Sequence, residues 1–244
     1  MTSKATRVIA VIVIAVLTMM ALCTAASYAA SKKVYKIPVK IKGQDSTHKI
    51  TYKGKTVKRT ITGNGFEKFV FKGSNKYSFK GKSPYEGSST YTMKRKSGRL
   101  VLLKGRNSAG DRITVKYYYK KGKLKKSITN QIFADDESYK KGKTVSTVKT
   151  DKYGNLKKVI TKGKLTKQNG KLEQYTNKTV FSNKYKGGSL YRSSMSYYTR
   201  TGKHWEKTFA DARTFSYKKV KLSKKQYNKY RPIIDYMVRN SMVF

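Results

Sequence analysis

The sequence predicts an all-β protein: an antiparallel β-meander of many short hairpins, either an open curved sheet or a barrel-like one, with a C-terminal α-helix. Three observations support this. Apolar and charged residues alternate with a period of two from Lys33 to Lys221, and turns containing glycine interrupt the alternation about every ten residues. The period then becomes helical after Leu222. A chain of 244 residues is long enough for a hydrophobic core and fits one or two domains.

The first 29 residues predict a secretory signal peptide. Lys4 and Arg7 precede an almost continuously apolar run from Val8 to Leu22, and the small residues of Ser27-Tyr28-Ala29 suit a signal peptidase. We expect cleavage after Ala29 and a secreted or cell-surface protein, bacterial in type. The apolar run is also nearly long enough to span a bilayer, so an uncleaved membrane anchor is the alternative.

The predicted organisation is a signal peptide at 1–29, a β-hairpin-rich domain at 30–222 and a helix at 223–244 that packs on the sheet. Cys23 is the only cysteine, so cleavage would leave a chain without thiols. Disulfides and thiolate metal sites are then excluded, and the fold must be held by burial and backbone pairing.

Two strands show the alternation most clearly. In Val34–Lys42 the apolar residues fall on one face and the lysines on the other, with Pro38 on the charged face. Proline cannot donate to a β-ladder, so we expect this to be an edge strand. Asp111–Tyr119 shows the same pattern, and its tyrosines, like Tyr197 and Tyr198, could either stack on sugars or bases or pack in the core.

A four-residue pattern predicts the tips of the hairpins. Its first residue varies, its second is glycine, its third is a basic residue or asparagine, and its fourth is leucine. Tight hairpin turns require positive φ, which glycine adopts readily, and the leucine would be the first buried side chain of the strand that follows the turn. The expected tips are Ser97–Leu100, Lys121–Leu124, Tyr153–Leu156, Lys162–Leu165 and Asn169–Leu172.

Two longer patterns bear on the origin of the hairpins. Motifs beginning at Tyr117 and ending at Lys141 reappear in the same order from Tyr197 to Lys219, which predicts an internal duplication. Residues 151–159 (DKYGNLKKV) resemble the hairpin unit of the YD-repeat family of bacterial surface and toxin proteins. The resemblance covers one turn and implies a hairpin there, with no function.

The C-terminal helix is predicted from a capping box and an apolar stripe. Ser223 and Gln226 have capping-box spacing, and Tyr227, Tyr230, Ile234 and Met237 then recur at helical spacing. Pro232 would destabilise a helix interior by about 3 kcal/mol, so we expect a kink or a restart there. The apolar stripe would cover an end or face of the sheet; an interfacial helix on a membrane is the alternative.

The sequence offers few catalytic residues, and we predict no enzyme, no metal and no cofactor. His48 and His204 are far apart, and neither lies near a nucleophile motif. Asp135-Asp136-Glu137 lacks the spacing of a calcium loop. The alternative function is a secreted hydrolase with His204 and Glu206 as its acid/base pair.

The strongest functional signal is charge. The chain has 46 lysines and 11 arginines against 12 acidic residues, a formal charge of +45. Such a protein should bind polyanions with an affinity that falls as salt rises, and the excess of lysine favours diffuse attraction over specific readout. The expected partners are anionic cell-envelope polymers, namely teichoic acid, acidic glycan or nucleic acid, with possible peripheral membrane contact.

The candidate polyanion-binding residues form one basic strand and several basic runs. They are Lys36, Lys40, Lys42, Lys120, Lys121, Lys123, Lys125, Lys126, Lys157 and Lys158. The alternative is a structural surface module whose lysines only keep the strands soluble and block edge-to-edge pairing.

Overall fold

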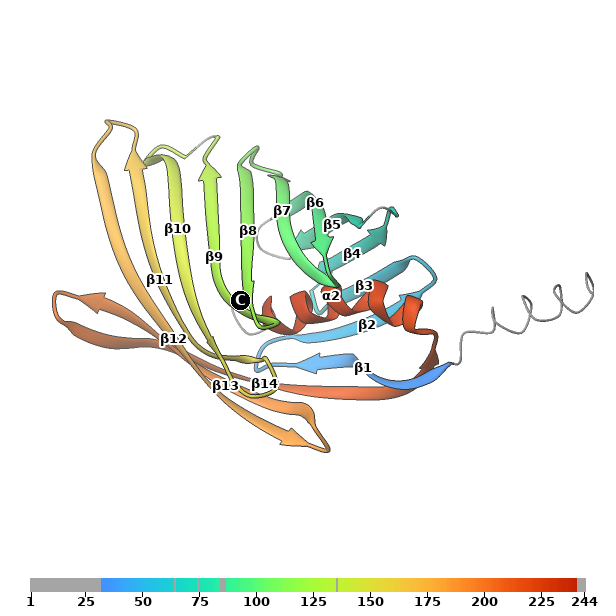
Figure 1. Cartoon of the computed structure of the whole chain (residues 1–244). Coiled ribbons are helices and arrows are strands. Elements are labelled where there is room, and N and C mark those ends of the chain that lie inside the picture. The colour runs from blue at the N-terminus through green and yellow to red at the C-terminus, as the bar shows by residue number, and fades with distance from the viewer. Residues whose placement is uncertain (1–31, 64, 74, 84–86, 135, 241–244) are drawn as a thin grey trace, which may run out of the picture.

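The computed structural model describes residues 32–63, 65–73, 75–83, 87–134 and 136–240 and shows fourteen strands and a C-terminal helix (Figure 1). The strands are β1 (Lys33–Lys42), β2 (Thr47–Lys53), β3 (Thr56–Ile61), β4 (Gly65–Phe71), β5 (Lys76–Ser83), β6 (Gly87–Lys96), β7 (Arg99–Asn107), β8 (Arg112–Lys120), β9 (Lys123–Ile132), β10 (Tyr139–Thr150), β11 (Leu156–Lys167), β12 (Leu172–Lys186), β13 (Ser189–Thr201) and β14 (His204–Leu222). The helix is α2 (Lys224–Asn240).

The strands form one closed antiparallel barrel in which each strand pairs with its neighbours in sequence and β1 pairs with β14. Closure depends on the length of β14. It pairs with β13 from His204, opposite Thr201, to Thr214, and with β1 from Thr214 to Leu222, opposite Lys33. The predicted all-β hairpin fold with a C-terminal helix is confirmed, and the barrel is the form it takes.

Alternation along each strand places one set of side chains inside the barrel and the other outside. The inward set of the first strands is large and apolar, and Ile41, Phe69 and Met93 are at most 1% exposed. Phe69 and Phe79 contact each other inside the barrel with ring centroids 4.9 Å apart. These inward side chains form the hydrophobic core together with one side of α2.

Helix α2 lies across one end of the barrel, beside the first strands (Figure 1). We call this the helix end; the turns after the even-numbered strands lie there. The Tyr227 ring stacks on Tyr35 of β1 at 4.0 Å, and the Tyr236 ring meets Phe69 of β4 at 5.7 Å. Met237 has no exposed surface, so the helix completes the core rather than lying on a separate face.

Hydrogen bonds fix the helix to the same strands. The Tyr77 hydroxyl of β5 donates to the Lys229 carbonyl at 2.8 Å, and the Tyr230 hydroxyl donates to the Gly54 carbonyl at 2.9 Å. The capping box also forms, because the Ser223 hydroxyl accepts from the Gln226 N–H, and the Gln226 side chain accepts from the Ser223 N–H, both at 3.1 Å. The helix continues through Pro232, so the expected restart is wrong.

Four of the five predicted hairpin tips are observed. Gly98, Gly122, Gly154 and Gly170 all lie in turns with positive φ. The tip predicted at Lys162–Leu165 is wrong, because Gly163 lies in the middle of β11 and is buried. The reason is packing: a Cβ on Gly163 would overlap the Tyr175 ring, so this glycine gives space to an aromatic neighbour.

Pro38 also differs from its prediction. It is buried rather than on the charged face, and it lies at a bulge where the β1–β14 register shifts between Pro38 and Lys40. Its carbonyl accepts a hydrogen bond from the Tyr52 hydroxyl of β2 at 2.8 Å. Strand β1 pairs with β2 only over Lys40–Lys42, so this bond holds the two strands together where their ladder is missing.

The predicted signal peptide lies outside the described residues. Within the described residues, no helix combines the length and the apolar character needed to cross a membrane.

Candidate polyanion-binding surface

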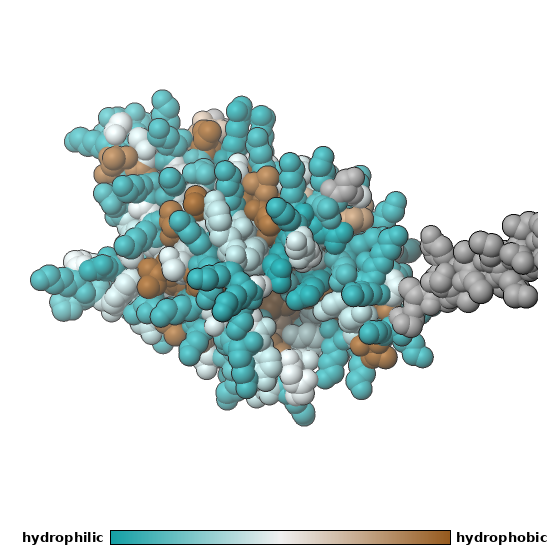
Figure 2. Space-filling view, in the orientation of Figure 1, coloured by the Kyte–Doolittle hydropathy of each residue, from teal (hydrophilic) through white to brown (hydrophobic). Residues whose placement is uncertain are grey.

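The outer wall of the barrel is rich in lysine. We define the outer wall as the outward-facing side chains of all the strands. Strand β10 shows the pattern: Lys141, Lys143 and Lys149 are exposed and face outward, whereas Val148 between them is buried. Figure 2 shows one face of the molecule covered largely by hydrophilic side chains, with only scattered apolar residues.

Many basic residues of the outer wall lie directly opposite one another on neighbouring strands. Like charges in this position destabilise a sheet by roughly 0.2–1 kcal/mol. A continuous row crosses three strands, with Lys58 of β3 opposite Lys68 of β4, which is opposite Lys80 of β5. The other pairs are Lys36–Lys219, Lys40–Lys49, Lys76–Lys94, Lys96–Arg99, Arg106–Arg112, Lys120–Lys123, Lys143–Lys164, Lys149–Lys158 and Lys184–Arg192.

The acidic residues do not neutralise this wall. Of those in the described part of the chain, Asp45, Glu137 and Glu206 are exposed, and the Glu173 side chain is 42% exposed beside Lys167. Most of the other described carboxylates bind buried arginines, hydroxyls or turn backbone; they are Glu67, Asp111, Asp136, Asp151, Glu173 and Asp211. The few negative charges are therefore used in the interior and in the turns.

Two of these carboxylates pair with arginines inside the barrel. Arg59 Nη2 lies 2.6 Å from Glu67 Oε1, and Arg213 Nε lies 2.7 Å from Asp211 Oδ2. His48 lies between the arginines, and burial together with their charges lowers its pKa to about 3. Its Nε2 is 3.2 Å from the Ser46 hydroxyl, so the ring is neutral and hydrogen-bonded.

A further carboxylate, Asp235, lies on the barrel side of α2. Burial raises its pKa, and the charges of Arg239, Arg231 and Arg99 oppose that rise. Two of these arginines, Arg231 and Arg239, belong to α2 itself, and Arg99 begins β7.

The predicted binding residues lie on the outer wall and in its turns. Lys36, Lys40 and Lys42 are all exposed on β1. Lys120, Lys121 and Lys123 surround the β8–β9 turn, Lys125 and Lys126 follow on β9, and Lys157 and Lys158 are on β11. Folding brings the last seven to the helix end, where Lys123 Nζ donates to the Asp151 carbonyl at 3.1 Å. The ammonium groups of Lys123 and Lys36 are therefore each partly occupied, Lys36 by the Gly187 carbonyl at 3.3 Å.

The sequence analysis missed most of the opposed basic pairs. Lys143 and Lys164 each follow a glycine, so neither is directly adjacent to another basic residue in the sequence. They meet only through the β10–β11 register. The available signal was the spacing of two between Lys141 and Lys143 and between Lys162 and Lys164, which places both lysines of each pair on the same face of their strand.

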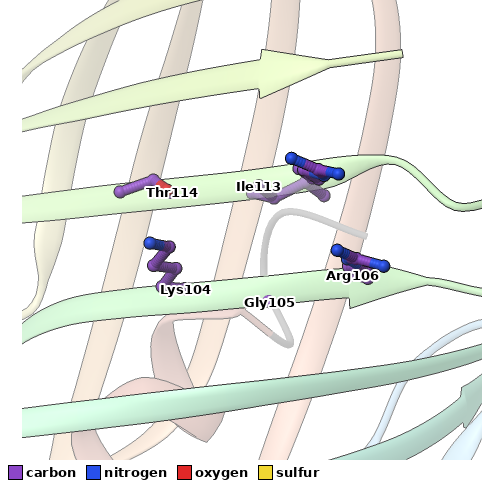
Figure 3. A pocket seen from close by; sticks show the side chains of 6 residues that line it. Lys104, Gly105, Arg106, Ile113 and Thr114 are labelled. Atoms are coloured by element: carbon purple, nitrogen blue, oxygen red, sulfur yellow. The ribbon is translucent and has the colours of Figure 1, made fainter. Parts of the chain in front are cut away.

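A hollow on β7 and β8 is lined by three basic residues (Figure 3). Its volume is about 210 Å³, and Lys104, Arg106 and Arg112 surround it with Thr114. Arg106 and Arg112 are directly opposite each other. Two guanidinium forks and an ammonium can together hold one phosphate, sulfate or carboxylate group.

A second, larger hollow of about 590 Å³ lies where the β12–β13 turn separates from β14. Lys36 crosses this space, because its Nζ donates to the Gly187 carbonyl at 3.3 Å. Lys186, Lys219 and the rings of Tyr191 and Tyr217 complete the lining. Burial raises the pKa of Tyr217 to about 12, so its phenol is neutral and adds no negative charge to the lining.

The residues proposed for the alternative hydrolase lie at the far end of the barrel. His204 and Glu206 are both exposed at the start of β14, and other residues line the two hollows. Asp136 caps the turn before β10, where its carboxylate accepts the Ser138 and Tyr139 N–H groups at 2.8 Å. Within the described residues, no three His, Cys, Asp or Glu side chains gather closely enough to hold a metal ion.

Comparison with known proteins gives no relative: no protein-family model matches the chain, and no curated protein or solved structure matches it.

Proposed function

We propose that this protein is a secreted or cell-surface, non-catalytic protein that attaches to anionic envelope polymers through the lysines of its outer wall. The observation that carries the proposal is the arrangement of like charges. Opposed basic pairs recur around the barrel, while most described carboxylates are held in the interior or the turns.

Solubility alone does not account for this arrangement. Alternating Lys and Glu would keep the strands just as soluble and would turn each repulsive pair into an attractive one. When both members of each opposed pair are basic, the positive electrostatic potential over the outer wall is higher, and this potential attracts a polyanion. The lysine excess suits a polymer of repeated phosphates, sulfates or carboxylates bound mainly through its charge.

The test is binding of heparin, a soluble acidic glycan, by the purified chain at about 50 mM NaCl. A variant with Lys143→Gln, Lys164→Gln, Lys149→Gln and Lys158→Gln removes two opposed pairs from β10 and β11. We expect binding at least about tenfold weaker than that of the unmodified chain. The matched control changes the same four residues to arginine, which keeps the charge and should keep the affinity.

Two results would contradict the proposal. One is the absence of heparin binding by the unmodified chain, which would favour a structural module. The other is equal binding by the glutamine and arginine variants, which would mean that these charges play no part.

A further inference from the structure

The inner side of the same strands has a different chemistry. We define the inner wall as the inward-facing residues of two rows that cross β9 to β13. One row places Ser127 opposite Ser146, then Thr161, Asn177 and Thr199; the next places Thr129 opposite Thr144, then Gly163 and Tyr175. Apart from the buried Gly163, these residues are partly exposed.

The inner wall carries hydroxyl, amide and phenol groups and no charge. The outward residues beside these rows include Lys126, Lys143, Lys162 and Lys178. Lysines recur among the outward positions beside these rows, whereas neither row contains a lysine. The inner wall instead uses groups that can both donate and accept hydrogen bonds.

Tyr175 lies flat against the inner wall. Thr144, Gly163 and Tyr175 are in register on β10, β11 and β12, and the Tyr175 hydroxyl reaches across Gly163 to the Thr144 hydroxyl at 3.0 Å. The ring must pass directly over Gly163, because a Cβ there would overlap it. One face of the ring therefore covers the strand, and the other faces the barrel interior.

Other polar groups surround this ring. Asn177 hydrogen-bonds the Tyr197 hydroxyl, and burial raises the pKa of that phenol. The hydroxyls of Ser146 and Thr161 bond to each other at 3.0 Å across the neighbouring strands. Each of these bonds fixes the position of a group that still has hydrogen-bonding capacity for a ligand.

We infer that the inner wall binds a neutral saccharide chain, with a sugar ring stacked on Tyr175 and its hydroxyls bonded to Asn177, Thr161 and their neighbours. A flat aromatic face beside donors and acceptors matches a pyranose, which has an apolar face and a rim of hydroxyls. A polyanion finds no cation on this wall. Glu173, at its rim, is already ion-paired with Lys167 at 3.2 Å.

Access is consistent with this ligand. Helix α2 occupies the helix end beside the first strands, whereas the described residues at the opposite end of β9 to β13 form hairpin turns (Figure 1). A linear saccharide can enter there along the strands without displacing the hydrophobic core.

The test is isothermal titration calorimetry of the full chain with cellohexaose, chitohexaose and xylohexaose in about 1 M NaCl, where exposed charges are screened within about 3 Å. We expect at least one of the three to bind with Kd below about 1 mM. Tyr175→Ala should weaken that binding by about tenfold or more, and Tyr175→Phe, which keeps the ring, should retain most of it.

The matched control is Tyr118→Ala, because Tyr118 is an outward-facing tyrosine, 44% exposed, and should leave the affinity unchanged. Asn177→Ala provides a second inner-wall variant if loss of the Tyr175 ring unfolds the barrel, and it too should weaken binding. Circular dichroism confirms that each variant is folded.

Three results would overturn the inference: no binding of any of the three saccharides, equal weakening by Tyr118→Ala, or saccharide binding at low salt that disappears in 1 M NaCl. Heparin binding by the same protein at low salt is measured separately. Heparin binding without saccharide binding would overturn only this inference, and the reverse would overturn only the proposed function.

Discussion

The two walls of β9 to β13 are made from the same strands and differ in almost every chemical respect. The outer wall carries lysines that face lysines, as at Lys143 and Lys164, and the inner wall carries hydroxyls that bond to hydroxyls, as at Ser146 and Thr161. A period of two is enough to build both, because successive side chains point to opposite faces. The comparison shows that the charge is placed by face and is not a general property of the chain.

The largest expected effect comes from moving a lysine to the wrong face. Met93 has no exposed surface and faces inward, whereas its neighbour Thr92 is exposed and faces outward. Met93→Lys buries an uncompensated charge and should destabilise the fold by about 5 kcal/mol or more, enough to unfold a marginal protein. Thr92→Lys should change stability by less than about 1 kcal/mol.

Urea unfolding of the two variants measures this difference. Comparable loss of stability in both would mean that the two faces are not distinguished by burial.

Removing one charge from the interior should have the next largest effect. Glu67→Gln leaves Arg59, which is 4% exposed, without its ionic partner, and we expect a loss of about 3–5 kcal/mol. Glu206→Gln removes the same charge from an exposed position and should change stability by less than about 0.5 kcal/mol. The free energies of unfolding in urea give both values, and similar losses would show that the buried pair adds nothing.

Acid should weaken the fold through His48. Its pKa lies at about 3 in the fold against 6.5 for a free side chain, so the unfolded chain binds a proton that the fold excludes. The stability that His48 contributes is complete above pH 6.5 and falls by about 1.4 kcal/mol per unit as pH decreases toward 3.

His48→Gln removes this titration and can still bond Ser46. The expected result is a loss of about 2 kcal/mol between pH 7 and pH 5 in the unmodified chain that the variant does not show. Identical pH profiles of the two proteins would exclude a role for His48. The raised pKa of Asp235 also makes stability depend on pH, but it does so equally in the unmodified chain and in the variant.

How far the sequence could predict the molecule differs between elements. The hairpins around Gly98 and Gly122 and the capping box at Ser223 are local, so a few neighbouring residues suffice to predict them. Barrel closure joins Lys33 to Leu222, and no local pattern encodes a contact over that separation.

The site follows the same division. Basic runs such as Lys120–Lys126 are visible in the sequence, but opposed pairs and the ring of Tyr175 over Gly163 depend on register between strands. The sequence predicts a turn at Gly163 because a glycine between two lysines has the composition of a turn; the contact that explains this glycine, the Tyr175 ring, lies on the next strand. The internal duplication and the cleavage site stay predictions.

The smallest expected effect tests the outer wall on its own. Lys143→Glu turns a repulsive pair with Lys164 into an attractive one and should stabilise the barrel by roughly 0.2–1 kcal/mol. The same change should weaken heparin binding. Thermal unfolding measures the gain, and a loss of stability would contradict the view that these lysines are kept at the expense of the fold.

The most direct test of the two-wall account is the salt dependence of both ligands on the unmodified chain. The logarithm of the heparin association constant should fall linearly with the logarithm of salt concentration, with a slope that corresponds to several released ions, while saccharide affinity stays constant over the same range. Heparin affinity that does not change with salt would contradict the account.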